Sequence, residues 1–202
     1  MYALAINGSP REGGNTERML SAALGPLRDA GWRTELVQVG GRPMRGCIAC
    51  FQCHKNKDKR CVLTEDAFNE VFARMLEADA IIIGSPTYFA DVTAETKAVL
   101  DRAGFVAMGN GRAFAGKIGA AVVVARRGGA IHVFDTINHM YYINRMVIPG
   151  SRYWNIGYGM GPGDVDKDEE AIKNMHHLGQ MIAWLGEAMA ARMATFPRGG
   201  EA

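Results

Sequence analysis

The four cysteines are the residues of this chain most clearly suited to chemistry. They are the only cysteines among 202 residues, and they lie in one short segment, C-I-A-C-F-Q-C-H-K-N-K-D-K-R-C. Their positions are Cys47, Cys50, Cys53 and Cys61. Cysteine thiolates are soft, anionic ligands that suit zinc and iron–sulfur clusters. The segment at about 45–62 is therefore predicted to be an insertion that binds a metal centre.

The spacing of the cysteines favours a single [4Fe–4S] cluster. In a C-x-x-C-x-x-C run, one turn of backbone directs three thiolates toward three irons, and Cys61 would supply the fourth ligand. Bacterial ferredoxins place their fourth cysteine three residues later, before a proline, where it binds a second cluster. Here seven residues separate Cys53 from Cys61, and Val62 follows. One cluster is therefore expected rather than two.

Three other states of the cysteines remain open: a zinc site, disulfides and buried thiols. Structural zinc sites normally combine two separated C-x-x-C pairs, a pattern that differs from this segment. The sequence opens without the basic region and cleavage site of a signal peptide. A reducing cytoplasm is therefore expected, where disulfides are rare.

The composition is that of an ordinary globular protein, with 48% hydrophobic and 22% charged residues. We expect one domain over residues 1–202, with the cysteine segment inserted in it. The net charge of +2, without a long basic run, gives no indication of nucleic-acid binding. The longest apolar runs are too short to cross a membrane.

The apolar pattern alternates between strand-like runs and helix-like segments. Strands are expected at Tyr2–Asn7, Thr34–Val39, Ala80–Gly84, Ile118–Val124 and Val147–Ser151. Helices are expected at Thr16–Ala30, from a cap at Thr64 through Leu76, at about 93–103, at about 133–145, and from a capping box of Asp166 and Glu169 to about Met193. Continuous apolar strands separated by helices predict a doubly wound parallel sheet with helices on both faces. Such sheets bind ligands at the carboxyl ends of their strands.

The loop after the first expected strand is suited to binding a phosphate. Its sequence is G-S-P-R-E-G-G-N-T, from Gly8 to Thr16, and it leads into the first expected helix. Glycines let backbone N–H groups converge on an anion, and Ser9, Thr16 and Arg11 add hydroxyl and guanidinium donors. The loop matches neither the dinucleotide nor the Mg-nucleotide fingerprint. A plain turn, with Asn15 or Thr16 as the helix cap, is the alternative.

Two further loops are expected at the same edge of the sheet. The loop after the third strand contains two adjacent aromatic residues, which could stack on a planar ligand. Its residues are Pro86, Thr87, Tyr88 and Phe89. The loop after the fourth strand combines positive charge with glycines that permit a close approach, in the run Arg126, Arg127, Gly128 and Gly129. Together the three loops predict one composite pocket.

These motifs resemble those of a known family. The G-S-P-R-x-x-x-N-T loop, the G-S-P-x-Y loop and the R-x-G-G-like turn on a β-α-β frame are similar to flavodoxin-like flavoproteins related to the NADPH-dependent FMN reductases. The C-x2-C-x2-C-x7-C segment is similar to the iron–sulfur flavoprotein branch of that family. The likeness covers about residues 1–193. It implies an α/β, flavodoxin-like sheet of five parallel strands in the order 2-1-3-4-5.

The resemblance also implies where FMN would bind. It places the phosphate on Ser9, Arg11, Gly14, Asn15 and Thr16. It places the flavin ring against Pro86, Thr87, Tyr88 and Phe89, with the polar edge of the ring near Arg127, Gly128 and Gly129. Many relatives have serine where this chain has Gly14, so one hydroxyl donor is absent and the backbone N–H remains.

The leading hypothesis is an FMN-dependent oxidoreductase. It would link a one-electron, ferredoxin-like donor through the [4Fe–4S] cluster to FMN and a two-electron, small-molecule acceptor. No side chain is assigned as a nucleophile or general base. Two alternatives remain: an NAD(P)H-dependent FMN or quinone reductase without a cluster, and a non-enzymatic, cysteine-based metal or redox sensor.

Two expectations concern protein partners. The stretch 54–60 holds four basic residues and one aspartate, and it is either a solvated loop or a docking patch for an acidic electron carrier. A homodimer or homotetramer is expected, because aromatic residues could cover the flavin from a neighbouring subunit. These residues are Tyr141, Tyr142, Tyr153 and Trp154.

Overall fold

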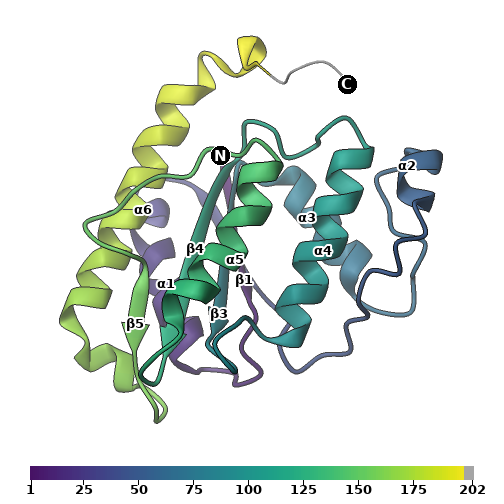
Figure 1. The fold of residues 1–202 in the computed structure, drawn as a ribbon. Helices are drawn as coiled ribbons and strands as arrows, with labels where there is room; N and C mark the ends of the chain where they lie inside the picture. Colours follow the sequence, from purple (N-terminus) through teal and green to yellow (C-terminus); the bar gives the residue numbers. More distant parts are fainter. Residues whose placement is uncertain (198–202) are drawn as a thin grey trace.

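The fold is built on one parallel sheet. In the computed structural model, which describes residues 1–197, five strands pair in the order β2-β1-β3-β4-β5 (Figure 1). The strands are β1 (Tyr2–Asn7), β2 (Arg33–Gln38), β3 (Ala80–Pro86), β4 (Ile118–Ala125) and β5 (Ile156–Tyr158). Their order confirms the predicted doubly wound topology. The last part of the expected domain, residues 198–202, lies outside the described range.

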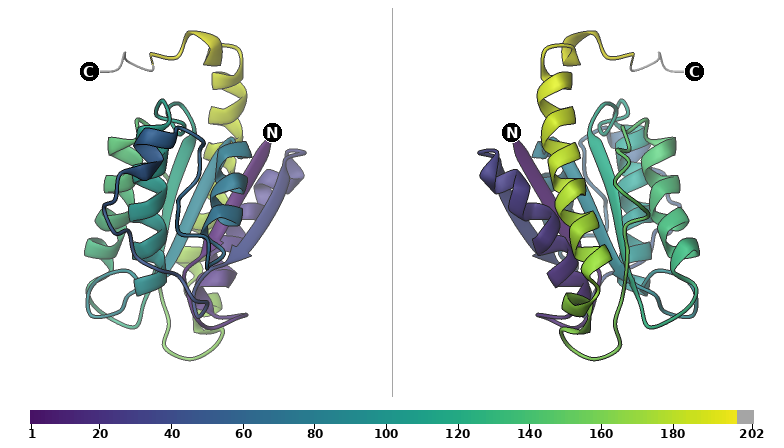
Figure 2. Two further views of the ribbon diagram at one scale, coloured as in Figure 1. Left: turned by 90° about the vertical axis from the view of Figure 1, so that its right-hand side faces the viewer. Right: turned by 90° about the vertical axis from the view of Figure 1, so that its left-hand side faces the viewer.

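Helices cover both faces of this sheet. They are α1 (Asn15–Asp29), α2 (Gln52–Asn56), α3 (Phe68–Glu77), α4 (Ala94–Gly109), α5 (Ala130–Ile143) and α6 (Glu169–Ala190). Short 3₁₀ helices span Asp164–Lys167 and Met193–Thr195. Seen along the sheet, α3, α4 and α5 lie on one side and α1 and α6 on the other (Figure 2).

The strands contribute to two cores, one under each layer of helices. On β1, Leu4 and Ile6 pack under α3, α4 and α5, whereas Ala3 and Ala5 pack under α1 and α6. Successive side chains of a strand point to opposite faces, so a strand covered on both sides is apolar at every position. Every residue of β1 and of β4 is buried, in agreement with their continuous apolar sequences.

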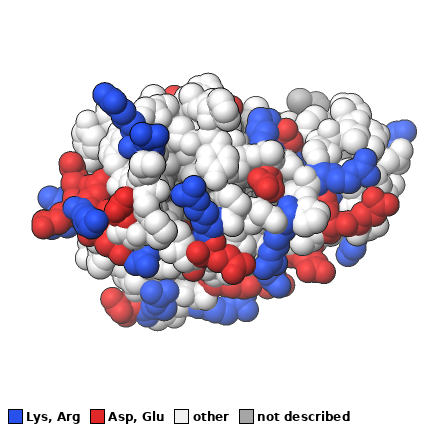
Figure 3. All heavy atoms as spheres, turned by 90° about the horizontal axis from the view of Figure 1, so that it is seen from below, with Lys and Arg blue, Asp and Glu red and all other residues white. Residues whose placement is uncertain are grey.

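The carboxyl ends of the strands form the lower edge of the molecule in Figure 1. Seen from that side, basic and acidic side chains are interspersed over the surface, and neither sign dominates (Figure 3). Among residues 1–197, no helix combines the length and the apolar character that a membrane span requires.

The fifth strand lies later in the chain than the sequence pattern indicates. Val147 forms only a single parallel bridge, with Ile118 at the start of β4. Pro149 has no N–H to donate to a strand ladder, so pairing does not continue beyond this point. β5 pairs instead with the last residues of β4. The expected strand at Val147–Ser151 is therefore wrong, and β5 is the fifth strand of the sheet instead.

Several helices begin at other residues than expected. Asp168, not Asp166, caps α6, and its Oδ1 accepts a hydrogen bond from the Ala171 N–H at 3.1 Å. Asp166 forms an ion pair with Arg18 instead. The expected cap at Thr64 is also wrong, because α3 begins only at Phe68.

The N-terminus of α1 is also not capped as expected. Gly14 occupies the cap position and no side chain there accepts a hydrogen bond, so neither Asn15 nor Thr16 is the cap. Gly25 and Pro26 do not end the helix, which continues to Asp29. The short α2 lies inside the cysteine segment, where no helix was expected.

Tyr141 of α5 ties this helix to the central strands β3 and β4. Its hydroxyl accepts a hydrogen bond from the Ile83 N–H and donates one to the Ala120 carbonyl, both at 3.1 Å. Its ring packs against Gly119, where an added Cβ would lie 2.6 Å from a ring atom. Burial raises the pKa of Tyr141 well above its ordinary value, so the hydroxyl remains a neutral donor. The expectation that Tyr141 could cover a flavin in a neighbouring subunit is wrong, because its side chain is fully buried.

Replacing Tyr141 by phenylalanine should destabilise the fold. The change removes both hydrogen bonds of the buried hydroxyl, which should lower the free energy of unfolding by about 1–3 kcal/mol. Tyr142→Phe is the matched control, because the Tyr142 side chain is 80% exposed. That control should shift the free energy of unfolding by less than about 0.5 kcal/mol. Urea unfolding measures the free energy of unfolding of both variants. Equal values for the two would show that the Tyr141 hydroxyl does not stabilise the fold.

Candidate functional site

Four loops at the carboxyl edge of the sheet, those after β1, β3, β4 and β5, enclose one cavity of about 280 Å³. Most of its lining comes from the two loops after β1 and β3, as the sequence indicates. These lining residues are Ser9, Arg11, Asn15, Thr16, Pro86, Thr87 and Tyr88. The structure therefore brings the expected phosphate-binding loop and the expected aromatic loop to the same place.

The loop from Gly8 to Thr16 is held by its own hydrogen bonds and by β2. The Asn7 Oδ1 accepts from the Ser9 N–H at 3.0 Å, and the Ser9 Oγ accepts from the Arg11 N–H at 3.2 Å. Gln38 of β2 donates to the Ser9 and Gly40 carbonyls. The first N–H groups of α1 have no acceptor within the helix, so they are free to bind an anion.

Gly8 and Gly40 permit this loop to approach its neighbours closely. An added Cβ at Gly8 would lie 1.8 Å from the Thr96 Oγ1, and one at Gly40 would lie 2.3 Å from the Ser9 carbonyl carbon. Any side chain at either position would therefore push the loop away from the edge of the sheet.

The aromatic loop turns sharply between Tyr88 and Asp91. The two residues exchange backbone hydrogen bonds of 2.8 and 3.0 Å, and Phe89 and Ala90 between them have φ values of 48° and 62°. A left-handed conformation costs a residue with a side chain roughly 1–2 kcal/mol. Such strain is typical of functional loops. The turn leaves Tyr88 on the cavity wall and the Phe89 ring fully exposed.

Thr87 contributes a polar atom that has no partner. Its Oγ1 is buried and forms no hydrogen bond among the described residues. Buried hydroxyl groups are nearly always hydrogen-bonded, so an unpaired one beside a cavity fits a polar ligand atom. The edge cavity therefore has the donor chemistry for a phosphate and a ring system with polar atoms.

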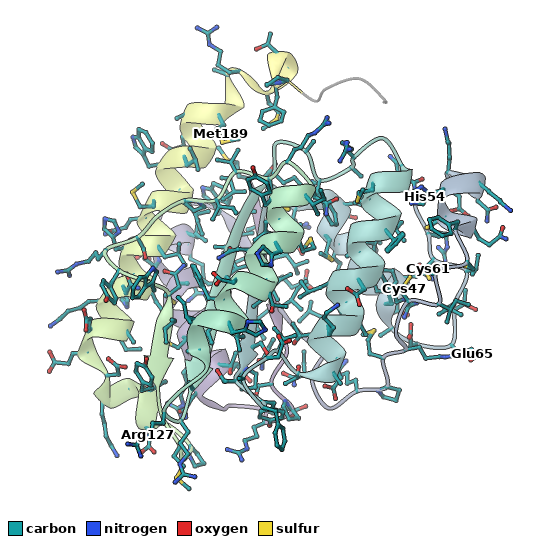
Figure 4. All side chains as sticks on the ribbon, viewed as in Figure 1. Cys47, His54, Cys61, Glu65, Arg127 and Met189 are labelled. Carbon is teal, nitrogen blue, oxygen red and sulfur yellow. The ribbon has the colours of Figure 1, made fainter. Side chains whose placement is uncertain are left out.

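Some residues implied by the family resemblance do not line this cavity. These are Gly14, Phe89, Arg127, Gly128 and Gly129. Arg127 lies at the lower tip of the molecule (Figure 4). Its neighbour Arg126 lines the cavity instead. Gly129 allows the loop after β4 to pack closely against the loop after β3. Its φ is 85°, and an added Cβ would lie 2.9 Å from the Ala90 Cα.

Sequence reasoning missed the loop after β5, which contributes Gly159 and Met160 to the lining. This loop is tied to the phosphate-binding loop, because the Asn15 Nδ2 donates to the Gly161 carbonyl at 2.9 Å. The Arg11 Nη1 also donates to the Met160 carbonyl at 3.4 Å. The loop was missed because the fifth strand was expected too early in the chain.

The cysteine segment forms a second, small cavity on the outer side of α4. Its lining includes all four cysteines, which are free thiols: Cys47, Cys50, Cys53 and Cys61. Figure 4 shows Cys47 and Cys61 close together beside α4. Burial raises the pKa of Cys53, and the three neighbouring thiols raise it further. A bound metal centre would reverse this penalty, because cations stabilise thiolates.

Among the described residues, no group of three or more His, Cys, Asp or Glu side chains is arranged to hold a metal ion. The four thiols thus share a cavity without forming a finished ligand set. The metal ligation of the cysteines remains a prediction that rests on their chemistry and spacing.

The backbone of the cysteine segment is strained. Four residues with side chains have positive φ values there: Ala49, Phe51, Lys57 and Lys59. The turns at these residues curl the segment around its cavity. The short α2 then packs on Gly109 of α4, where an added Cβ would lie 2.6 Å from the His54 ring.

Arg102 of α4 anchors both ends of the cysteine segment. Its Nη1 donates to the Arg45 carbonyl at 3.1 Å and to the Asp66 Oδ2 at 2.5 Å. Its Nη2 donates to the Leu63 carbonyl at 2.9 Å. Although burial acts to raise the pKa of Asp66, hydrogen bonds from Arg102 and from the Arg45 and Phe68 N–H groups hold it below its ordinary value. The ion pair is therefore charged in the folded protein.

The two cavities are separate in the described part of the chain. They share no lining residue, and the cysteine cavity lies beside α4, whereas the edge cavity lies below the sheet. One chain therefore presents two sites of different chemistry.

Comparisons with known proteins identify relatives that match nearly the whole chain. An iron–sulfur flavoprotein of Methanocaldococcus jannaschii is 32% identical over 190 residues, which cover 91% of this chain and 96% of the relative. An iron–sulfur flavoprotein of Archaeoglobus fulgidus is 33% identical over 184 residues, which cover 91% of this chain and 79% of the relative.

Solved structures share the fold at lower sequence identity. RosB, solved with a bound 8-demethyl-8-formylriboflavin-5'-phosphate intermediate, has a TM-score of 0.73 at 17% identity, over 100% of this chain and 89% of RosB. A flavodoxin from the domain Archaea has a TM-score of 0.60 at 18% identity, over 93% of this chain and 99% of the flavodoxin. These structures confirm the flavodoxin-like fold.

The family assignment rests on the sequence matches. A model of the NADPH-dependent FMN reductase family matches residues 1–161. The family and the flavoprotein relatives set aside the hypothesis of a non-enzymatic sensor. This chain belongs to the iron–sulfur flavoprotein branch of the NADPH-dependent FMN reductase family and is a flavin-dependent oxidoreductase.

Proposed function

We propose that this chain binds FMN at the edge cavity and one [4Fe–4S] cluster at the cysteine cavity, and that it transfers electrons between them. The observation that carries this proposal is the presence of two cavities whose lining chemistries differ. The edge cavity offers hydroxyl and guanidinium donors beside a helix N-terminus, and the cysteine cavity offers four free thiols. The names of the iron–sulfur flavoprotein relatives support the same pair of cofactors.

The FMN phosphate would bind to the loop between β1 and α1. The N-terminus of α1 provides backbone N–H groups and partial positive charge for an anion. Ser9, Arg11, Asn15 and Thr16 add side-chain donors. The Gly14 N–H, which the family resemblance also implies, donates to the Arg11 carbonyl at 3.2 Å. The Thr87 hydroxyl and the Tyr88 ring would contact the flavin. Phe89, Arg127, Gly128 and Gly129 would then lie at the rim.

The role of the side chains is to bind and to orient. When bound, FMN exchanges electrons singly or in pairs, and an iron–sulfur cluster exchanges them singly. The four cysteines would supply anionic sulfur ligands, while Phe105 and Val106 line the cavity from α4. No side chain is assigned to move a proton.

The electron donor would be a ferredoxin-like protein, and the final acceptor a small molecule. The basic stretch 54–60 follows the third cysteine directly, and four of its residues are exposed and positively charged: Lys55, Lys57, Lys59 and Arg60. Positive charge increases the encounter rate with an acidic carrier. The cytoplasmic location remains a prediction.

The family match favours a second candidate function. The matched model describes NADPH-dependent FMN reductases, in which NADPH is the named electron source. NAD(P)H would then donate a hydride to the flavin, and the cysteines would take no part. Steady-state turnover with NAD(P)H in protein that lacks iron would support this candidate.

Removing phosphate donors should weaken FMN binding. A hydrogen bond to a charged group contributes about 1.5–3 kcal/mol, so Arg11→Ala with Thr16→Ala should raise the Kd for FMN at least about tenfold. Arg28→Ala, an exposed change at the other end of α1, is the control and should leave the Kd unchanged. Titration with FMN and with riboflavin measures both affinities. Equal binding of FMN and riboflavin by the wild type would show that the phosphate is not held.

Replacing Cys61 by serine should remove the cluster and leave FMN bound. Iron clusters require soft sulfur ligands, so iron content and the broad absorbance at about 400 nm should be lost. FMN should remain because its cavity has no lining residue in common with the cysteine cavity among the described residues. Lys55→Ser, an exposed change in the same segment, should retain iron.

Anaerobic purification with iron, zinc and flavin assays tests this prediction. Full iron content in Cys61→Ser would show that the fourth ligand is another residue. Stoichiometric zinc in the wild type would exclude the cluster.

We also propose a homodimer or homotetramer. Tyr142, Tyr153 and Trp154 are exposed and could cover FMN in a neighbouring subunit. Light scattering of the FMN-bound protein at micromolar concentration should give a multiple of the chain mass of 21.9 kDa. A mass equal to one chain would contradict this assembly.

A further inference from the structure

Arg102 has one hydrogen-bond donor that its anchoring role does not use. The side chain is 1% exposed, and both of its terminal nitrogens donate to Arg45, Leu63 and Asp66. Its third nitrogen, Nε, is buried and has no partner among the described residues. A buried N–H without an acceptor destabilises the folded protein, and more so in a charged group. Such an atom is rarely left unpaired without a ligand.

The polar side chains that share a cavity with Arg102 are the four cysteines. Arg102 lines the same cavity as Cys47, Cys50, Cys53 and Cys61. The other described residues of that lining are apolar: Ile48, Ala49, Phe51, Val62, Leu63, Phe105 and Val106. Arg102 is therefore the one charged side chain in the described lining, where the four thiols are the other polar side-chain groups. Its contacts with Asp66 and with the Met44 Sδ use Nη1, not Nε.

The charge distribution of the anchor favours interaction with an anion. Asp66 pairs with the Nη1 side of the guanidinium and is not part of the cavity lining. The Arg102 Cζ lies 4.0 Å from the centre of the Phe68 ring, which fixes the plane of the group from one side. The ion pair thus presents its positive part toward the cysteine cavity and its negative part away from it.

We propose that the Arg102 Nε donates a hydrogen bond to a sulfur atom of the cluster, either a cysteine Sγ or a cluster sulfide, and thereby raises the reduction potential of the cluster. This inference rests on the proposed function, in which the four cysteines hold that cluster. Reduction adds negative charge to the cluster, so a hydrogen bond to sulfur stabilises the reduced form more than the oxidised form. Arg102 is a positioning residue that tunes the potential, and it is not a ligand.

Arg102→Lys tests this role, because lysine retains the charge that pairs with Asp66 and loses the planar fork with its Nε donor. At a fixed solution potential, the ratio of reduced to oxidised cluster should fall about tenfold, which equals about 59 mV for one electron. Arg45→Lys is the matched control, because the Arg45 side chain is exposed and forms only a surface ion pair with Glu65. Anaerobic redox titration followed by EPR measures the potential, with iron and FMN content measured on the same samples.

The expected result is a lower cluster potential in Arg102→Lys, with iron and FMN retained and the FMN potential unchanged. An iron-loaded Arg102→Lys protein with the potential of the Arg45→Lys control would overturn the proposal. A wild type without iron would overturn the proposed cluster and this inference with it, and iron analysis distinguishes that outcome from the first.

A second measurement needs no variant and applies if Arg102→Lys loses its iron. Pulsed EPR of the reduced wild type, labelled with ¹⁵N-arginine, should detect a hyperfine coupling from an arginine nitrogen to the cluster. Arg102 is the only arginine in the described lining of the cysteine cavity. Absence of that coupling would overturn the proposal.

Discussion

Parallel pairing of all five strands is the constraint on which the arrangement of this molecule depends. It places the carboxyl ends of the strands at one edge, so the loops after β1, β3, β4 and β5 meet there although they are far apart in sequence. Both faces of the sheet are covered by apolar cores, and unpaired polar groups in them would be costly. The edge, where α1 also begins, is left for polar ligands.

The cysteine segment leaves this edge after β2 and lies against the outer side of α4. It depends instead on a buried ion pair, Arg102 with Asp66, whose side chains are 0% and 2% exposed. Removing one partner of such a pair typically costs about 3–5 kcal/mol, because the other charge stays buried and unpaired. One guanidinium therefore holds residues on both sides of the four cysteines, and it determines where their cavity forms.

Much of the edge site could be predicted because it depends on local sequence. Strands buried on both faces are apolar at every position, and the glycine-rich loop before α1 is contiguous in the chain. The fifth strand could not be placed, because Val147 begins a pairing that Pro149 stops. Because β5 was not placed, the contribution of Gly159 and Met160 to the lining of the edge cavity was not predicted either.

The anchoring role of Arg102 was not predictable for a different reason. An arginine in an amphipathic helix is normally solvent-exposed, and nothing in the local sequence indicates its pairing with Asp66. Its partners lie 36, 39 and 57 residues away in the chain, so only the tertiary structure brings them together. The cysteine spacing likewise indicates ligand chemistry but not the support that holds the ligands.

Much of the backbone strain and three of the six buried, unpaired polar atoms of the described residues lie at the same two places. Within the described residues, eight non-glycine residues have positive φ values. Four of them lie in the cysteine segment, and two, Phe89 and Ala90, form the aromatic turn. The buried atoms without partners include the Thr87 Oγ1, the Arg102 Nε and the His54 Nε2, each beside one of the two cavities or on a loop that forms it. Such costs persist only where the surrounding structure enforces them. Six of the eight strained residues lie in the loops where the ligands would bind, and the other two, Arg112 and Arg145, lie outside them.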